Sequence, residues 1–151
     1  MGHKTFTQLV KKSWSSAVST AAKNLSSYRP QIIEALRSSI PDERSAAVAA
    51  LNEGNDAAAH DAVIQLIDDP DELVRIEVAE YLEDLGAEDD VVLLLERVEK
   101  YPALRMLLTR ALQSITGRED GLITEDDPPE KVAADMEGWR TYLADKGFPV
   151  S

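Results

Sequence analysis

Apolar residues recur along the chain in two alternating patterns, and each fits one face of a helix. The arginine pattern has an arginine, apolar or small residues three and four positions later, and a leucine seven positions later; it spans residues 44–51, 75–82 and 105–112. The stripe pattern has apolar residues at positions 0, 1 and 4, and it begins at Ile32, Ala62 and Val91. Each pattern returns after about 30 residues, which predicts a stack of two-helix units.

Proline and glycine mark the ends of the arginine pattern. A proline precedes each copy and a glycine follows it, at Pro41 and Gly54, Pro70 and Gly86, and Pro102 and Gly117. Proline suits the first turn of a helix because its missing N–H would be unpaired there anyway. Glycine suits a left-handed cap because it has no Cβ. We therefore expect each helix to start after its proline and to end in a left-handed glycine cap.

The two ends of the chain depart from these patterns, as terminal repeats do. Residues 5–26 predict a single amphipathic helix, within a capping segment 5–29, with this apolar face: Phe6, Leu9, Val10, Trp14, Ala17, Val18, Ala21, Ala22 and Leu25. Its other face holds lysine and serine, so the alternative is a basic helix that lies on an anionic membrane or docks on a partner.

The C-terminal part divides into a polar loop and a last helix. Residues 118–128 are acidic and rich in turn-forming residues, and we expect a solvated connection that is exposed enough for ligand or partner contact. Residues 129–147 predict a capping helix whose buried face consists of Val132, Met136, Trp139, Tyr142 and Leu143. With a repeat core over 30–117, the whole chain, 1–151, is expected to form one domain.

The segment "IQLIDDPDELVRIEVAEYLEDLG" resembles a HEAT repeat, with its short helix pair, aspartate and proline at the turn, and arginine in the following helix. The resemblance covers residues 30–117 and extends to the HEAT-like repeats of the phycobilisome-lyase-like bacterial subgroup. It implies an all-α fold, a right-handed α-solenoid of about four helix pairs, or about eight helices, with degenerate capping repeats. It also implies an inner face formed by the second helix of each pair, and a protein-binding scaffold with no catalytic residue.

The charge is distributed unevenly along the chain. Residues 1–30 hold five basic side chains and no acidic one, whereas residues 31–151 hold 11 basic and 28 acidic side chains, a net charge of −17. A field of that sign repels nucleic acid and attracts basic partners. The chain has no cysteine, no apolar run long enough to span a membrane, and no apolar stretch typical of a signal peptide at its start. We therefore expect a cytoplasmic protein with no direct binding to nucleic acid by its acidic body.

Residues for enzyme chemistry are scarce. The two histidines are His3, near the start, and His60, inside a predicted helix, and the seven glycines stand singly rather than in a phosphate-binding loop. Acidic clusters at 68–72, 88–90 and 125–127 lack the spacing of a calcium loop, and acids near helix starts also favour the helix dipole. We predict neither catalytic nor metal-binding residues, and no cofactor.

The repeated arginines Arg44, Arg75 and Arg105 are expected to form an internal ladder, because a partly buried guanidinium needs carboxylate or carbonyl acceptors. The acids proposed for this ladder are Asp42 and Asp71, on neighbouring turns. Contact with a partner is the alternative role for these arginines. A structural ladder predicts that substitutions impair folding before binding.

A candidate protein-binding face follows from the stripe pattern. In each copy, the residue two positions after the first stripe residue lies about 150° around the helix from the centre of the stripe. These residues form a column along the stack: Glu34, Ile64 and Leu93. Beside it lie Gln31, Asp61 and Asp90 on one side and Ser38, Asp68 and Arg97 on the other. We expect the column to lie on the second helix of each pair and hence on the concave surface, where it forms an apolar centre with an acidic rim. Cover by terminal helices, or by a second copy of the chain, is the alternative.

Three function classes remain. The first is a scaffold or adaptor that binds a basic protein on this acidic, partly apolar face. The second is an immunity or inhibitor protein that neutralises a basic toxin or nuclease through the same surface. The third is a lyase-like subunit that handles a chromophore, as implied by the resemblance to that subgroup. The partner's identity and the oligomeric state do not follow from the sequence.

Overall fold

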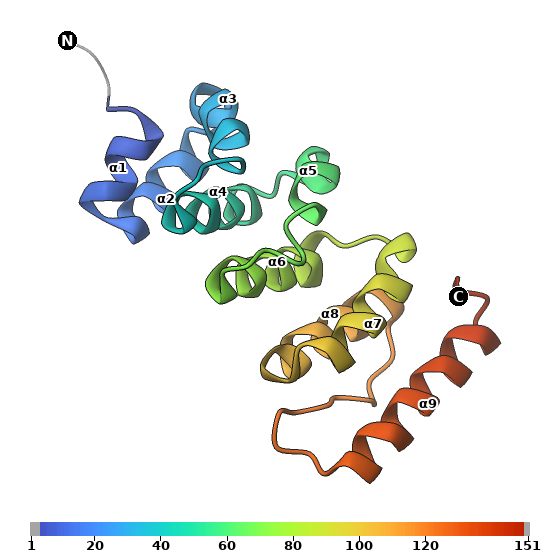
Figure 1. Cartoon of the computed structure of the whole chain (residues 1–151). Helices are drawn as coiled ribbons and strands as arrows, with labels where there is room; N and C mark the ends of the chain where they lie inside the picture. Colours follow the sequence, from blue (N-terminus) through green and yellow to red (C-terminus); the bar gives the residue numbers. More distant parts are fainter. Residues whose placement is uncertain (1–3, 150–151) are drawn as a thin grey trace. The chain divides into compact units, whose positions relative to one another are not determined.

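The computed structural model describes residues 4–149, and every regular element among them is helical (Figure 1). This confirms the expected all-α class and its helix pairs. Nine α-helices lie in the described range, close to the eight expected. They are α1 Phe6–Lys12, α2 Trp14–Lys23, α3 Leu25–Ala35, α4 Pro41–Glu53, α5 His60–Ile64, α6 Glu72–Leu85, α7 Val91–Lys100, α8 Arg105–Thr116 and α9 Pro129–Asp145, with short 3-10 turns Ala57–Ala59, Glu88–Asp90 and Pro102–Leu104.

Backbone contacts divide the chain into two compact units, the first ending at Tyr81 and the second beginning at Leu82. The first unit holds α1 to α5 and most of α6. The second holds the last turn of α6 together with α7, α8 and α9. The single domain expected over 1–151 stays a prediction.

The stripe pattern forms α3, α5 and α7, and the arginine pattern forms α4, α6 and α8. In chain order the stripe helices therefore come first in each pair, and our assignment of the column Glu34, Ile64 and Leu93 to second helices was wrong. In the first unit α4 packs against both α2 and α3. Its run Ala46–Leu51 is buried, because small side chains let two neighbouring helices approach the same backbone closely.

The amphipathic helix expected over residues 5–26 is divided between α1 and α2, and its last two residues belong to α3. The apolar face is correct, since Phe6, Val10 and Ala17 are buried, but Ser13 separates α1 from α2. Ser13 has an extended backbone, and its hydroxyl accepts a hydrogen bond from the N–H of Ser16, so it starts a new helix. A serine that competes for backbone hydrogen bonds can end a helix without interrupting the apolar pattern.

The proline and glycine signals are only partly confirmed. Pro41 opens α4 and Gly117 caps α8 with φ of 81°, both as expected. Pro102 opens a 3-10 turn before α8, however, and Gly54 and Gly86 are not left-handed. A Cβ added to Gly86 would lie 2.4 Å from the carbonyl oxygen of Leu82, so glycine avoids a backbone clash where α6 ends.

Two of the three repeated arginines meet at Asp69, an acid that was not among those predicted. Arg44 donates from Nε and Nη2 to the two carboxylate oxygens of Asp69, at 2.8 and 2.9 Å, and from Nη1 to the carbonyl of Ser38. Arg75 donates to the carbonyl of Asp69 at 2.7 Å. Asp69 therefore joins both arginines, and Asp42 and Asp71 pair with neither in these hydrogen bonds.

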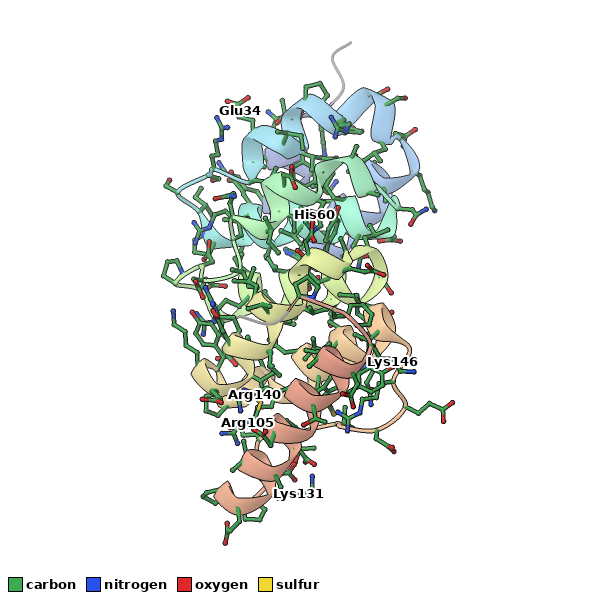
Figure 2. The ribbon with its side chains drawn as sticks, turned by 90° about the vertical axis from the view of Figure 1, so that its right-hand side faces the viewer. Glu34, His60, Arg105, Lys131, Arg140 and Lys146 are labelled. Carbon is green, nitrogen blue, oxygen red and sulfur yellow. The ribbon has the colours of Figure 1, made fainter. Side chains whose placement is uncertain are left out.

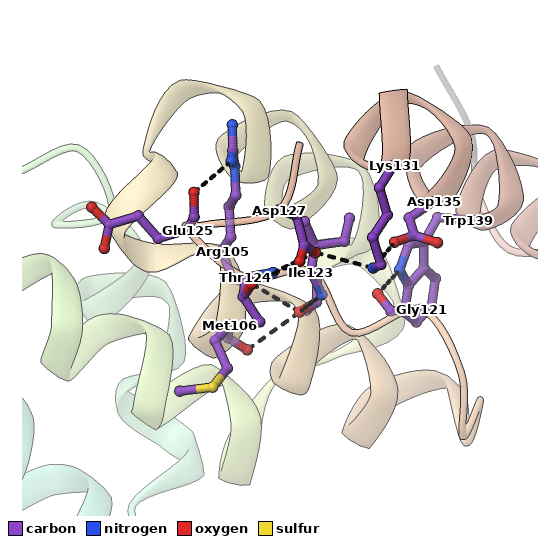
Figure 3. Close-up of polar contacts among 11 residues, drawn as sticks. Arg105, Met106, Gly121, Ile123, Thr124, Glu125, Asp127, Lys131, Asp135 and Trp139 are labelled. Carbon is purple, nitrogen blue, oxygen red and sulfur yellow. Dashed lines mark hydrogen bonds and ion pairs between the residues drawn. The ribbon is translucent and has the colours of Figure 1, made fainter. Parts of the chain in front are cut away.

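The third arginine meets the loop 118–128 instead (Figure 3). Arg105 donates from Nη1 to the carbonyl of Glu125 at 3.3 Å. The hydroxyl of Thr109, which donates to the carbonyl of Arg105, accepts the N–H of the fully buried Ile123. The loop is thus anchored on α8 by its backbone, which corrects the expectation of a merely solvated connection.

The last helix lies where the sequence predicts it, with Val132, Met136, Trp139 and Leu143 buried and Tyr142 half-buried. The indole N–H of Trp139 donates to the carbonyl of Gly121 at 2.7 Å (Figure 3). Gly121 has φ of 92°, and a Cβ there would lie 2.5 Å from the indole nitrogen. Only glycine therefore fits at this point, where the loop meets α9.

Asp127 holds the end of the same loop. Its carboxylate accepts the N–H and the hydroxyl of Thr124 and pairs with Lys131 at 3.0 Å. The backbone hydrogen bond from Thr124, followed by the bond from Lys131, lowers the pKa of Asp127 to about 2. The carboxylate therefore stays ionised across ordinary pH and keeps α9 tied to the loop.

We predict that Arg44→Met lowers the free energy of unfolding by about 3–5 kcal/mol, because it leaves the buried carboxylate of Asp69, 4% exposed, without its cation. Arg110→Met is the matched control, since Arg110 pairs with Glu83 at the surface and should cost less than about 1 kcal/mol. Urea unfolding followed by circular dichroism measures both. Arg44→Met combined with Asp69→Asn should recover part of the loss, and equal small losses for both single variants would contradict the ladder.

The two tryptophans should differ in their contribution to stability. Trp139 is fully buried, so Trp139→Ala should cost about 3–5 kcal/mol. Trp14 is half-buried and donates to the hydroxyl of Ser45 at 3.0 Å, so Trp14→Ala should cost only about 1–2 kcal/mol. The same urea titrations compare them, and a larger loss for Trp14→Ala would contradict the packing described here.

Glu77 on α6 should make stability depend on pH. Burial, with a smaller effect from Glu80, raises the pKa of Glu77 to about 7. A carboxyl whose pKa is raised in the folded state contributes most below its unfolded pKa, and this contribution is lost as pH rises through 7. We expect stability to fall by about 1–3 kcal/mol between pH 5 and pH 8, and Glu77→Gln to flatten this profile. An unchanged profile in thermal unfolding of the variant would contradict the assignment.

Candidate functional site

In the first unit, four of the predicted contact residues remain accessible. Glu34 on α3 is exposed (Figure 2), as are Asp61 on α5 and Asp68 in the turn after it. Ile64, between the two aspartates in sequence, is half-buried. The predicted contact face with Ile64 at its centre stays a prediction, and Ile64 is less exposed than that prediction requires.

In the second unit, the predicted residues differ in their access to solvent. Asp90 is 5% exposed, and its carboxylate accepts the N–H of Ala87 at 2.8 Å, so it caps a turn and cannot contact a partner. Leu93 is half-buried. Arg97 pairs with its neighbour Glu96 at 3.1 Å. Asp90 is thus removed from the candidate face.

A polar hollow of about 590 Å³ adjoins Glu34 in the first unit. The side-chain oxygen of Gln31 accepts the N–H of Phe6 at 2.7 Å, and the buried Glu43 accepts the hydroxyl of Ser38 at 2.8 Å. Two polar side chains that line the hollow, Gln31 and Glu43, therefore already have hydrogen-bond partners within the fold. The lining residues are Thr5, Thr7, Gln31, Glu34, Ala35, Arg37, Ser38 and Glu43.

A groove of about 530 Å³ lies between α7 and α9 within the second unit. Its apolar lining comes from both helices: Val92 is half-buried, Ala144 is exposed, and Leu95, Met136 and Leu143 are at most 8% exposed. Charged and polar side chains form its edges: Glu96 and Glu99 on α7, and Glu137, Arg140 and Thr141 on α9. This α7–α9 groove combines an apolar floor with an acidic rim, the arrangement that the sequence led us to expect elsewhere.

Arg140 is the cation among the residues that line the α7–α9 groove. Its guanidinium lies 3.2 Å from the carboxylate of Glu99 and 3.7 Å from that of Glu137, so it connects α9 to α7. All three side chains are more than half exposed, at 51%, 58% and 74%. Water therefore screens these ion pairs strongly, and they hold the groove only loosely.

The sequence reasoning missed the α7–α9 groove, although part of its signal was present. Val92 and Leu95 belong to the predicted apolar stripe of α7, and Met136 and Leu143 to the predicted buried face of α9. The pairing of these two helices was not predicted, because α9 carries neither repeated pattern. Without that pairing, Arg140 is simply a surface residue.

The described residues contain neither a metal-binding cluster nor a helix that could cross a membrane. Among residues 4–149, no three histidine, cysteine, aspartate or glutamate side chains are grouped so that they could hold a metal ion. In the same range, no helix has the length and apolar character needed to cross a bilayer. His60 lies 3.0 Å from Asp61, and His3 lies outside the described residues.

The comparisons with known proteins identify the repeat family. The family model described as HEAT repeats matches residues 29–113, which include most of α3 and α8 and everything between them. The searches of curated proteins and of solved structures found no match. Helices α1, α2 and α9 lie outside the matched range. Because the match covers more than half of the 151 residues and contains all three repeated helix pairs, the chain belongs to the HEAT-repeat family.

Proposed function

We propose that the protein is a non-enzymatic interaction module that binds a basic partner protein through an acidic, partly apolar surface. HEAT repeats generally act as protein-interaction modules, and proteins of this family are typically not enzymes. The acidic face and the basic nature of the partner are our own additions to that general role.

One observation carries the proposal, namely that exposed carboxylates flank an apolar side chain in the sequence of α5 and the turn after it. Asp61 and Asp68 are exposed on either side of the half-buried Ile64. A contact of this kind lets apolar area contribute affinity while the charges guide the approach of a basic surface and exclude acidic ones. Glu34 on α3 adds a further exposed carboxylate in the same unit.

The overall charge supports the same type of partner. The chain carries 28 acidic against 16 basic side chains, and a net charge of −12 accelerates encounters with cationic proteins. Such steering weakens as salt shortens the range of the field. Binding should therefore be faster and tighter at low ionic strength.

The proposal is tested by affinity capture from the lysate of the native host, with the double charge reversal Asp61→Lys/Asp68→Lys as the variant. We expect wild type to retain a basic protein that is released by salt, and the variant to lose at least 90% of it, an order-of-magnitude loss that corresponds to about 1.4 kcal/mol. Both substituted side chains are exposed, so circular dichroism should show an unchanged fold.

The matched control is Asp84→Lys/Glu88→Lys, which changes the net charge equally at two exposed positions of the second unit. It should retain the partner, because the contact depends on position and not on total charge. If both reversals lose the protein equally, the residues Asp61, Ile64 and Asp68, which we call the α5 surface, are not the site. Retention of the same proteins by all three baits would contradict the proposed contact.

A further inference from the structure

The α7–α9 groove is a second surface, built partly from a helix outside the repeats. Val92 and Leu95 come from α7, inside the HEAT match, whereas Met136, Leu143 and Ala144 come from α9, which begins after it. The groove therefore exists only because α9 packs beside the last repeat pair. It also lies in a different unit from the α5 surface.

We propose that the α7–α9 groove binds one amphipathic α-helix of a partner protein, with its apolar face on the groove floor and lysine or arginine side chains at the rim. The inference rests on the proposed function only in treating the chain as a protein-binding module. It uses residues that the α5 surface does not contain, so each proposal can fail without the other.

The dimensions of the groove fit a short stretch of helix. Its lining runs from Val92 to Glu99 on α7 and from Met136 to Ala144 on α9. At a rise of about 1.5 Å per residue, these stretches are roughly 10–12 Å long, or about two helical turns. Two turns of an amphipathic helix present apolar anchors at positions i, i+3 or i+4, and i+7, which is the usual arrangement for a helix in a groove.

The charges at the rim specify a basic helix. The lining of the groove contains three glutamates and one cation: Glu96, Glu99, Glu137 and Arg140. Arg140 already shows how a cation is received there, since its guanidinium contacts the carboxylates of both Glu99 and Glu137. A lysine or arginine of the partner would compete with Arg140 for these two carboxylates. Arg140 should therefore oppose binding, although it lies within the site.

This competition predicts effects of opposite sign at neighbouring residues. Glu99→Gln/Glu137→Gln should weaken binding of a basic helix at least fivefold, because it removes two negative charges from the rim. Arg140→Gln should strengthen binding at least threefold, because it frees both carboxylates. Arg110→Gln is the matched control: Arg110 also forms an exposed ion pair, with Glu83 at 3.0 Å, so its loss changes the net charge equally elsewhere in the second unit.

The probe is a synthetic amphipathic helix of leucine and lysine, about 18 residues long and labelled with fluorescein, and anisotropy reports its binding at about 0.15 M salt. A scrambled peptide of the same composition has the same charge without an apolar face. A leucine and glutamate peptide has the apolar face with the opposite charge. We expect both control peptides to bind at least tenfold more weakly than the probe.

A variant with a blocked groove shows whether the probe binds in the groove or is attracted only by the overall charge of the protein. Ala144→Arg places a cation in the groove at an exposed position and should weaken binding at least tenfold. Ala58→Arg makes the same change at an exposed position of the first unit and should alter binding less than twofold. Circular dichroism checks that both variants keep their helices.

Three results would overturn the groove proposal. The first is equal strengthening by Arg140→Gln and Arg110→Gln, and the second is equal binding of the scrambled peptide. The third is a concentration-dependent dimer in analytical ultracentrifugation that disappears in Ala144→Arg, which would make a second copy the occupant. If the probe behaves as expected while Asp61→Lys/Asp68→Lys retains every captured protein, the α5 proposal fails and the groove proposal stands.

Discussion

A carboxylate can be buried in the turn between α5 and α6 only because Arg44 reaches it from α4. Asp69 receives two hydrogen bonds from that guanidinium, and its carbonyl receives one from Arg75, so one residue connects three elements of the first unit. The packed side of α4 consists largely of alanine, which allows close approach but offers little shape to fix one position. A two-point ion pair has a narrow geometry and therefore fixes how the turn lies on α4.

The second unit replaces this ion pair with an anchored loop. Arg105 finds a backbone carbonyl instead of an aspartate, and Thr109 and Trp139 fasten the loop from both sides. The guanidinium of Arg118 adds a contact 4.6 Å from the Trp139 ring. Because the loop is fastened along its length, α9 is held beside α7 and forms one wall of the groove. The end of the repeat array is thus closed by polar contacts to backbone atoms as well as by apolar packing.

Periodicity predicted the helices and their alternation well, because 30-residue spacing reflects which faces must be buried. It failed where a single side chain decides between two hydrogen-bond partners. Ser13 breaks the first helix, and Asp90 caps a turn instead of facing a partner. Asp69, not Asp42 or Asp71, binds Arg44. The α7–α9 groove was missed for a related reason, since contact between non-repeating helices leaves no period in the sequence.

Carboxylates have two separate uses in this chain, and composition alone does not distinguish them. Glu43, Asp56, Asp69 and Asp90 are all at most 9% exposed and accept hydrogen bonds from within the fold. These acids stabilise helix ends and turns, and their charge is largely compensated or withdrawn from solvent. The charge available to a partner is therefore carried by exposed acids such as Asp61, Asp68, Glu99 and Glu137. In the function that we propose, their positions beside half-buried or apolar side chains, more than the total of 28 acids, decide where a basic protein binds.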